Sequence, residues 1–587
     1  MALHDAGGRH RTPNWARLLP PLARRFERRL RTAAIADASF ASIVLLASIP
    51  LFAGILVLVT PGRILSREMT CDFVYNLSGA WHLHYGHLAH VDFHGPLGEL
   101  NFLLTLAGFR IVGPTPHAFL VGVIIVALAV FMLASWAAWR RLPLLPAVLF
   151  VVFTSLLVLM PANVGDRPSD FSFAMSYNRY CWSAISILAL ILFIPPRREW
   201  HDWLGDWMDV AVGGVLLAAM FYLKVTYFVT GLAAVGFAAV LFPHVRSWWG
   251  AWAAIVGLAI ANAAAPYSRA YLQDIWAAAN AGGIRTGLAL HIGNFFANSE
   301  SYAAYVAAFM AACFMYLRGL APLRLAAATG FIFVGSLALL SQNAQLRGTP
   351  LAIVVAFVFY DQLRQHAVQK PLNAMVPLLV SLMIFPLLSI GVSSTSLIAY
   401  FARTHGNERL VVVDRTQLKG LAVWAEDGKL LEAFGSGRID YKLLNSARRV
   451  GVRYELSPFE YVETIMEAAA LLQDGRHVQG NIVLLDQVNP LPFMLGIEPP
   501  RGGNLWSGVG EPVHEASAVL GKADHVLIPK FPSFSDATET AVLEYGAYMA
   551  EHFPNREETQ SWVVFSREDA VRGPRGHVPQ SSAAYWP

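Results

Sequence analysis

Long apolar runs separated by short polar segments fill the chain from about residue 38 to residue 402. A helix needs about 20 apolar residues to cross the hydrocarbon core of a bilayer. The pattern therefore predicts a polytopic α-helical membrane protein with about eleven transmembrane helices. Their expected ranges are residues 38–60, 117–139, 142–161, 181–195, 208–223, 226–243, 249–266, 301–317, 325–341, 350–362 and 372–396.

Basic residues between these runs predict how the chain crosses the membrane. Arginines gather in residues 24–31 before the first run, and Arg140-Arg141 follows the second. Cytoplasmic loops carry an excess of lysine and arginine. We therefore expect a multi-pass protein of the inner (plasma) membrane, with residues 1–37 in the cytoplasm and a first periplasmic loop over residues 61–116. One kinked helix over residues 208–243 would invert every later span, but the basic loops further along argue against it.

The composition changes after about residue 402, where charge rises and the apolar runs shorten to strand length. A helix is expected over residues 458–472, where Ser457 caps, Pro458 takes the first helical position and Glu460 follows. A second helix is expected over residues 536–551. Strands are expected at residues 410–413, 481–485, 525–528 and 562–565. The alternation predicts a soluble periplasmic α/β domain, residues 403–587, with a partly parallel sheet and no glycine-rich cofactor loop.

Composition supports the membrane class and excludes others. Of the 587 residues, 55% are hydrophobic and only 14% are charged, with a formal net charge of +4. The clearest basic cluster lies before the first apolar run, so nucleic acid is not expected as a partner. That run spans about twenty residues without a small-residue cleavage pattern, which indicates a retained first span rather than a signal peptide.

Three cysteines are too few for a disulfide framework or a thiolate zinc site. Cys71 and Cys181 both fall at predicted outer ends of spans, so they could form one bridge or remain free thiols. Cys313 falls within a predicted span and is expected to pack there.

A polar island in the first outer loop is the strongest candidate site. It contains Asp72 and Tyr75, then Asp92 and His94 in the segment His90–Gly98. Asp72 and Asp92 are the candidate catalytic residues, and Tyr75 and His94 are candidate substrate-binding residues. Ionisable groups are costly close to a bilayer, so those retained at its outer edge are candidates for function.

Several cations are expected at the same membrane face. The arginine fork matches phosphate oxygens well, so these residues are candidates for binding a donor phosphate, although each could instead neutralise a nearby carboxylate. They are Arg179, Lys224, Arg269, Arg285 and Arg347, and Asn178 beside Arg179 is a further substrate-binding candidate.

Two candidates have alternative explanations. Asp92 could orient the acceptor, assist a base or join His94 at a divalent metal, or it could cap a short helix that begins near Pro96 and lies along the membrane surface. Trp506 follows a strand end and could stack on a sugar or dock the C-terminal domain on the membrane part. A divalent metal is possible as a cofactor, but the five histidines at 82, 84, 87, 90 and 94 match no known zinc pattern and could simply be amphipathic.

An acidic residue soon after the first span, followed by Asp92-Phe93-His94-Gly95-Pro96-Leu97 before the second, resembles the C-type glycosyltransferase superfamily (GT-C). The resemblance covers about residues 35–400 and the placement of a soluble domain after the last span. Members include dolichyl-phosphate-mannose protein mannosyltransferases, bacterial lipid A aminoarabinose transferases and oligosaccharyltransferase catalytic subunits. Many carry two adjacent acids in the first loop, whereas Cys71-Asp72 stands here, so a two-carboxylate metal site is in doubt.

The resemblance implies that residues 38–402 form a GT-C-like catalytic domain. It implies inverting transfer of a sugar from a polyprenyl-phosphate donor to a glycan, lipid or protein acceptor at the periplasmic side. Asp72 would match the general base, and Arg179 or Lys224 would stabilise the departing phosphate. Two other classes remain open. A lipid or sugar transporter or flippase should carry charges at mid-membrane depth, which are scarce here. A non-catalytic scaffold subunit of an envelope polysaccharide machine would not need Asp72.

Overall fold

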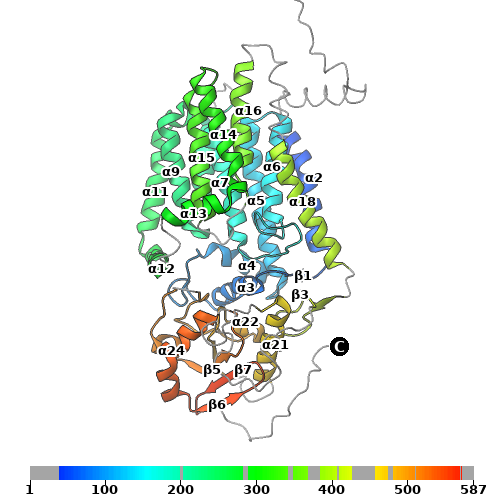
Figure 1. Ribbon diagram of the computed structural model, residues 1–587, viewed down its shortest axis with the longest axis vertical. Coiled ribbons are helices and arrows are strands. Elements are labelled where there is room, and N and C mark those ends of the chain that lie inside the picture. The colour runs from blue at the N-terminus through cyan, green and yellow to red at the C-terminus, as the bar shows by residue number, and fades with distance from the viewer. Residues whose placement is uncertain are drawn as a thin grey trace, which may run out of the picture.

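A bundle of long helices forms one end of the protein and a mixed α/β C-terminal region forms the other (Figure 1). The computed structural model describes residues 39–197, 203–281, 288–341, 348–367, 384–405, 409–425, 456–473, 480–508, 511–533, 535–568 and 570. Helices α3 and α4 lie between the two ends and cross the direction of the bundle.

Apolar sequence accounts for the bundle, since every expected span coincides at least in part with a described helix. The expected range 372–396 begins outside the described residues, and its helix is described from Ile384. The bundle helices are α2 (Phe40–Val59), α5 (His117–Arg141), α6 (Leu144–Leu159), α7 (Ser176–Phe193), α8 (Trp203–Leu223), α9 (Val225–Leu241), α10 (Pro243–Arg246), α11 (Trp249–Ala264), α14 (Ser299–Leu317), α15 (Leu323–Ser341), α16 (Ala352–Ala367) and α18 (Ile384–Thr404).

Six described helices are long and apolar enough to cross a membrane. A seventh span is added if α11 and the following helix, which bend by 77° at their junction, count as one. Four further apolar helices are shorter, at 10–17 residues, including α6 and α9. The chain is therefore a multi-pass membrane protein by the length and composition of its helices, and the count of eleven spans stays a prediction.

The segment expected to be the first outer loop, residues 61–116, is more ordered than the sequence indicated. It contains β1 (Ile64–Leu65), α3 (Thr70–His84) and α4 (Leu100–Val112). The expectation of a helix from about Pro96 was early by four residues, because Gly98 packs against the end of α8 instead. Helix α3 was not expected at all. Residues 73–82 are all buried, so α3 lacks the polar face that gives a surface helix its sequence periodicity.

The expected outer loop over residues 267–300 also contains helices. They are α12 (Pro266–Ala281) and α13 (Leu288–Ala297).

The C-terminal region contains two small sheets. In the first, β1 pairs in parallel with β3 (Leu421–Trp424), which pairs antiparallel with β2 (Leu410–Val412). The second has the order β4-β5-β7-β6. Its strands are β4 (Asn481–Leu484), β5 (Ala523–Pro529), β6 (Asn555–Glu558) and β7 (Trp562–Ser566), and only the β4 and β5 pair is parallel. The partly parallel sheet agrees with the expectation, whereas β1, β3 and β6 were not predicted.

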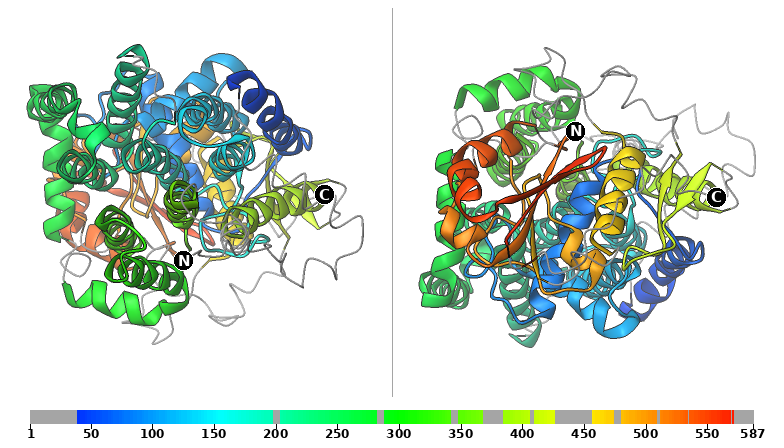
Figure 2. Two further views of the ribbon diagram at one scale, coloured as in Figure 1. Left: turned by 90° about the horizontal axis from the view of Figure 1, so that it is seen from above. Right: turned by 90° about the horizontal axis from the view of Figure 1, so that it is seen from below.

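Four helices accompany these sheets. They are α21 (Pro458–Gln473), α22 (Leu491–Leu495), α23 (Ala516–Leu520) and α24 (Ser535–His552). Figure 2 (right) shows α21 in yellow and α24 in orange-red on opposite sides of the long red strands. The expected cap of α21 is present, since the Glu460 amide donates to Ser457 Oγ over 3.2 Å and the Ser457 amide donates to Glu460 Oε2 over 2.9 Å.

Candidate functional site

Asp72 lies in the first turn of α3, where the bundle meets the C-terminal region. Met69 caps this helix in a left-handed conformation, with φ of 52°, and offers no side-chain hydrogen bond. The Trp506 side chain, from the C-terminal region, donates a hydrogen bond to the Asp72 carboxyl group. Burial raises the pKa of Asp72 to about 6, and the bond from Trp506 opposes this rise. Sequence analysis named both Asp72 and Trp506 as site residues, but it did not predict that they are in contact.

Apolar and aromatic side chains surround this carboxylate. Tyr75 lies one turn along α3 on the same face as Asp72, in a buried cluster against which Cys71, Tyr177 and Trp506 pack. The cluster consists of Tyr75, Phe93, Leu97, Phe102, Val488 and Leu505. Burial raises the pKa of Tyr75, and the charge of Asp72 adds to the rise. Tyr75 is therefore a neutral phenol beside Asp72.

A second carboxylate, Asp486, approaches the same side chains from the end of β4. The Ser533 amide and hydroxyl donate to it over 3.0 and 3.1 Å. Burial first, and then the charges of both Asp72 and Asp486, raise the pKa of the Cys71 thiol. Cys71 is therefore a neutral thiol, and all three cysteines are free, so no bridge joins Cys71 to Cys181.

Lys224 brings a cation to the bundle side of this site. It caps α9 at the turn after α8, and its Nζ donates to Asn178 Oδ1 over 3.3 Å. Nζ also lies 5.4 Å from the centroid of the Tyr177 ring, which packs on the aromatic cluster. The structure therefore brings together Asp72, Tyr75 and Trp506 from the predicted residues, and it links Asn178 and Lys224 to them through Tyr177.

A close backbone approach fixes the first outer loop beside Lys224. A Cβ atom at Gly98 would lie only 2.1 Å from the carbonyl oxygen of Tyr222, near the end of α8. The Gly98 amide donates to the Leu223 carbonyl over 3.3 Å. Only glycine allows this contact, so the second half of the Gly95-Pro96-Leu97-Gly98 segment serves as a backbone joint.

Asp92 lies with a different set of partners. It accepts from the Leu88 amide over 2.8 Å and pairs with Arg501 Nη1 at 3.2 Å. Although partial burial acts to raise the pKa of Asp92, these two donors lower it. Asp92 does not cap the helix after Pro96. In the described residues its contacts are those of an ionised group that holds the first loop to the C-terminal region.

His94 lies at the same junction but binds Asp274 of α12. His94 Nδ1 and His90 Nδ1 lie 3.0 and 2.9 Å from the two oxygens of the Asp274 carboxylate. The His94 ring stacks on His514 with centroids 4.2 Å apart. Within the described segments, no three His, Cys, Asp or Glu side chains are arranged to hold a metal ion. We therefore assign no catalytic step to a metal.

The remaining predicted cations do not gather around Asp72 in the described residues. Arg179 is fully buried and its Nη1 donates to the Ala162 carbonyl over 3.2 Å, while its Nε and Nη2 atoms have no hydrogen-bond partner in the described chain. Arg269 is exposed on α12. Arg285 and Arg347 lie outside the described residues.

Backbone bonds explain how Trp506 reaches Asp72 across more than 400 residues. The His94 amide donates to the Gly503 carbonyl over 3.0 Å, and the Leu505 amide donates to the His94 carbonyl over 2.9 Å. These bonds seat residues 503–505 along the first outer loop, so the next residue faces α3. Sequence reasoning missed Asp486 and Tyr177. Only Asp486 gave a signal, as a carboxylate directly after a predicted strand.

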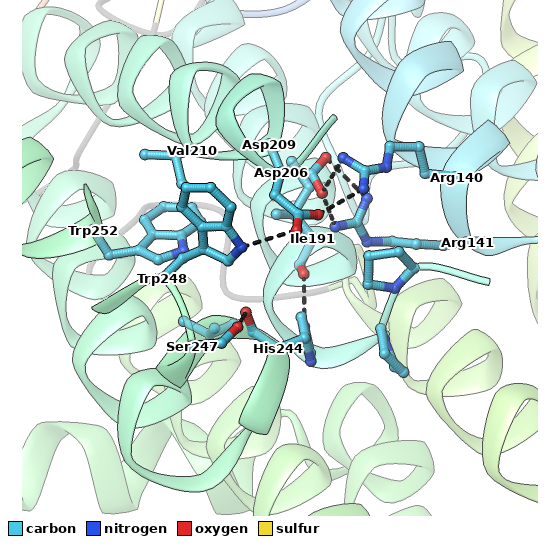
Figure 3. Close-up of a pocket in the computed structure, with 13 residues that line it drawn as sticks. Arg140, Arg141, Ile191, Asp206, Asp209, Val210, His244, Ser247, Trp248 and Trp252 are labelled. Carbon is cyan, nitrogen blue, oxygen red and sulfur yellow. Dashed lines mark hydrogen bonds and ion pairs between the residues drawn. The ribbon is translucent and has the colours of Figure 1, made fainter. Parts of the chain in front are cut away.

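A charged pocket of about 210 Å³ lies at the far end of α5 (Figure 3). Arg140 pairs with Asp206 at 2.7 Å and with Asp209 at 3.0 Å. Arg141 also pairs with Asp209, at 2.6 Å. The two positive and two negative charges neutralise each other. We therefore interpret these ion pairs as a link between α5 and α8, and we assign them no catalytic role.

Comparisons with known proteins gave matches only among solved structures. No family model and no curated protein matches the chain. The structure is similar to ArnT from Cupriavidus metallidurans in the apo state, at 13% identity and a TM-score of 0.43 over 91% of this chain and 99% of ArnT. The structure is also similar to ArnT from the same organism bound to undecaprenyl phosphate, at 12% identity and a TM-score of 0.40 over 92% of this chain and 100% of that ArnT chain.

A third similar structure is the Archaeoglobus fulgidus oligosaccharyltransferase complex with zinc and sulfate. The identity is 10% and the TM-score is 0.33, over 86% of this chain and 69% of that one. In overall structure the chain is thus similar, at low sequence identity, to ArnT and to an oligosaccharyltransferase.

Proposed function

We propose that this protein is a membrane glycosyltransferase that moves a sugar from a polyprenyl-phosphate donor to an acceptor hydroxyl or amine. The observation that carries the proposal is the environment of Asp72. Its carboxylate lies at the junction of an apolar helical bundle and an α/β region, where burial raises its pKa to about 6. A base with a pKa near the working pH abstracts protons efficiently.

In the proposed reaction, Asp72 takes a proton from the acceptor as the acceptor atom attacks the anomeric carbon. A bond forms from that atom to carbon, and the bond from carbon to the lipid phosphate oxygen breaks with inversion. The lipid phosphate leaves with the electron pair. Lys224, held by Asn178, lies on the bundle side of the site and is the cation we assign to that developing charge.

Other residues act by positioning in this proposal. Trp506 holds the Asp72 carboxylate, and Tyr75 lines the site beside it. Asp92, through Arg501, and His94, through Asp274, hold the first outer loop against its neighbours. Arg179 keeps its proposed role in donor binding through two nitrogen atoms that lack partners in the described chain.

We also propose the arrangement in the membrane that this chemistry needs. Residues 38–402 form the catalytic membrane domain, and residues 403–587 form a domain on the periplasmic side of the inner membrane. The apolar bundle gives a lipid-linked donor access to Lys224 from the bilayer.

The test is sugar transfer by the purified protein in nanodiscs with a panel of polyprenyl-phosphate sugars, read as release of the lipid phosphate. Asp72→Asn should lower kcat by at least about a hundredfold, because a positioned base contributes roughly 10²–10⁴. It should leave donor binding within about twofold, since a neutral amide of the same size does not alter the bundle. Asp92→Asn is the matched control on the same loop, and should keep kcat within about tenfold because Asp92 only positions the loop.

Equal activity of Asp72→Asn and the parent would contradict the proposal and favour a scaffold role. Binding of lipid-linked sugar without phosphate release in the parent protein, across the whole panel, would favour a transporter.

A further inference from the structure

The C-terminal region contains a cavity of about 390 Å³ that the proposed reaction has not yet used. It lies where parallel strand β4 ends, between loop residues 500–508 and 511–513 on one side and the first half of α24 on the other. The carboxyl ends of parallel strands are the usual place for ligands in α/β sheets. The volume falls in the range of roughly 300–1,000 Å³ that is typical of small-molecule sites.

The lining of this cavity suits a hydroxyl-rich ligand. It includes Asn489, Ser507, Glu511, Thr540 and the ring of Tyr545. Asn489 Oδ1 is a buried acceptor with no hydrogen-bond partner in the described residues, although its Nδ2 donates to the Ile482 carbonyl over 2.8 Å. An unmet buried acceptor costs free energy, and a ligand hydroxyl would satisfy it.

Hydrogen bonds hold the walls of the cavity in place. Asn504 donates to the Pro512 carbonyl over 2.8 Å and bonds the His514 ring over 2.8 Å. The Tyr545 hydroxyl donates to the His514 carbonyl over 3.1 Å, which joins this loop to α24. Because these groups are fixed before a ligand arrives, binding costs less ordering entropy.

The cavity lies next to the site around Asp72. Leu505 and Ser507 line it, and Trp506 between them donates to Asp72. The charge of Glu511, which also lines it, acts on Tyr75. A ligand held here would therefore lie close to Trp506, the residue that donates to Asp72.

We propose that this cavity binds a sugar unit of the acceptor, so that the acceptor is a glycan rather than a lipid or a protein. That the bound saccharide is an acceptor rests on the proposed function, but saccharide binding itself can be measured without any reaction. The sugar unit enters from the C-terminal region while the donor reaches Asp72 from the bundle.

The experiment is saturation-transfer NMR of the full protein in nanodiscs with di- and trisaccharides of neutral hexoses, hexosamines and pentoses. At least one saccharide should bind the parent protein. Ala537→Leu, at a position on α24 that lines the cavity, should raise the Kd by at least about tenfold, because the added carbons occupy ligand space. Ala547→Leu makes the same change at an exposed position of α24 and should leave the Kd within about twofold.

Thermal unfolding reports whether Ala537→Leu folds. If Ala537→Leu does not fold, Val513→Phe is used instead, at an exposed position of the cavity lining, and it should also raise the Kd for the saccharide. Absence of binding by every saccharide, or equal binding by the lining variants and the control, would overturn the inference. Phosphate release measured on the parent protein separates the two proposals. Donor turnover without saccharide binding would contradict only the saccharide site. Saccharide binding without donor turnover would contradict only the proposed reaction.

Discussion

At the scale of single residues, the pKa of Asp72 is set by opposing effects. Burial at the junction disfavours its charged form, while the Trp506 hydrogen bond favours that form. Its place in the first turn of α3 also favours a negative charge, because a helix N-terminus carries partial positive charge. Burial dominates, so the pKa is about 6 and a large part of the population is ionised at neutral pH.

The first prediction concerns Trp506→Phe, which keeps an aromatic ring but removes the N–H donor. The pKa of Asp72 should rise further, so the acidic limb of the kcat/KM profile should move to higher pH by about one unit. The profile of steady-state phosphate release against pH measures this. In an Asp72→Asn background the same change should have no further effect on the limb, and an unchanged or lower midpoint in the parent would contradict the role of Trp506.

The second prediction concerns stability. A carboxyl group whose pKa is raised in the folded protein does not lower the free energy of unfolding at pH values below its ordinary pKa of 3.8. Its full destabilising effect is present at pH values above about 6. Asp72→Asn keeps the acceptor for Trp506 and removes the charge, so it should stabilise the protein at pH 8 by up to about 3 kcal/mol. Thermal unfolding at pH 8 and pH 4 checks this, with a clear gain only at pH 8. A loss of stability at pH 8 would count against a desolvated carboxylate.

Sequence reasoning found individual residues of the site but not their contacts. Asp72 and Lys224 were chosen because charged groups are costly close to a bilayer, and Trp506 because it follows a strand end in the C-terminal region. Asp92 was grouped with Asp72 because it is near in sequence, yet its partner Arg501 lies more than 400 residues away. Asp486 was passed over because its strand sits in another region, and only the folded chain places it near Cys71.

At the scale of elements, α3 depends on one close helix contact. A Cβ atom on Gly79 would lie 2.4 Å from the Phe102 ring of α4. Phe102 in turn meets Tyr75 edge-on, with ring centroids 5.4 Å apart. The face of α3 that carries Asp72 and Tyr75 is therefore positioned by α4.

The third prediction follows from this contact. Gly79→Ala should destabilise the protein by about 1–3 kcal/mol, because the Phe102 ring must move in a filled interior. It should also lower kcat through the displaced Tyr75. Gly236→Ala in α9 is the matched control, since nothing lies within 4 Å of its added carbon, and it should be neutral or slightly stabilising. Unfolding temperature and phosphate release measure both, and equal behaviour of the two variants would contradict the prediction.

Elements with a clear pattern were predicted well. Long apolar runs gave the bundle helices, and Ser457 with Glu460 marked the start of α21. Helix α3 was missed because burial on all sides removes the alternation of apolar and polar faces. Strand β1 was missed because two residues carry no pattern, and their partner comes from Leu421 and Ala422.

At the scale of the whole molecule, the bundle separates two ends of different composition. The Arg140 and Arg141 pairs lie at one end, and Asp72 and the C-terminal region lie at the other. Basic residues favour the cytoplasmic side, so the first end should face the cytoplasm.

The fourth prediction is that the two ends label from opposite sides. Ala547→Cys on α24 and Leu320→Cys at the turn after α14 both replace exposed residues. In cells whose outer membrane alone is permeable, an impermeant thiol reagent should modify Ala547→Cys, and should modify Leu320→Cys only after the inner membrane is opened. Variants are made with the three natural cysteines replaced by serine or alanine. Labelling of Leu320→Cys in intact spheroplasts would invert the orientation.

Pairing of β1 with β3 sets the order in which a newly synthesised chain can mature. The ribosome adds the 357 positions from Ile64 to Leu421 at roughly 5–20 residues per second, which takes about 20–70 s. Until then the short strand has nothing to join, and Trp506 is not yet made. A half-made or prematurely ended chain thus inserts its first helices before either the pairing of β1 with β3 or the contact of Trp506 with Asp72 can form.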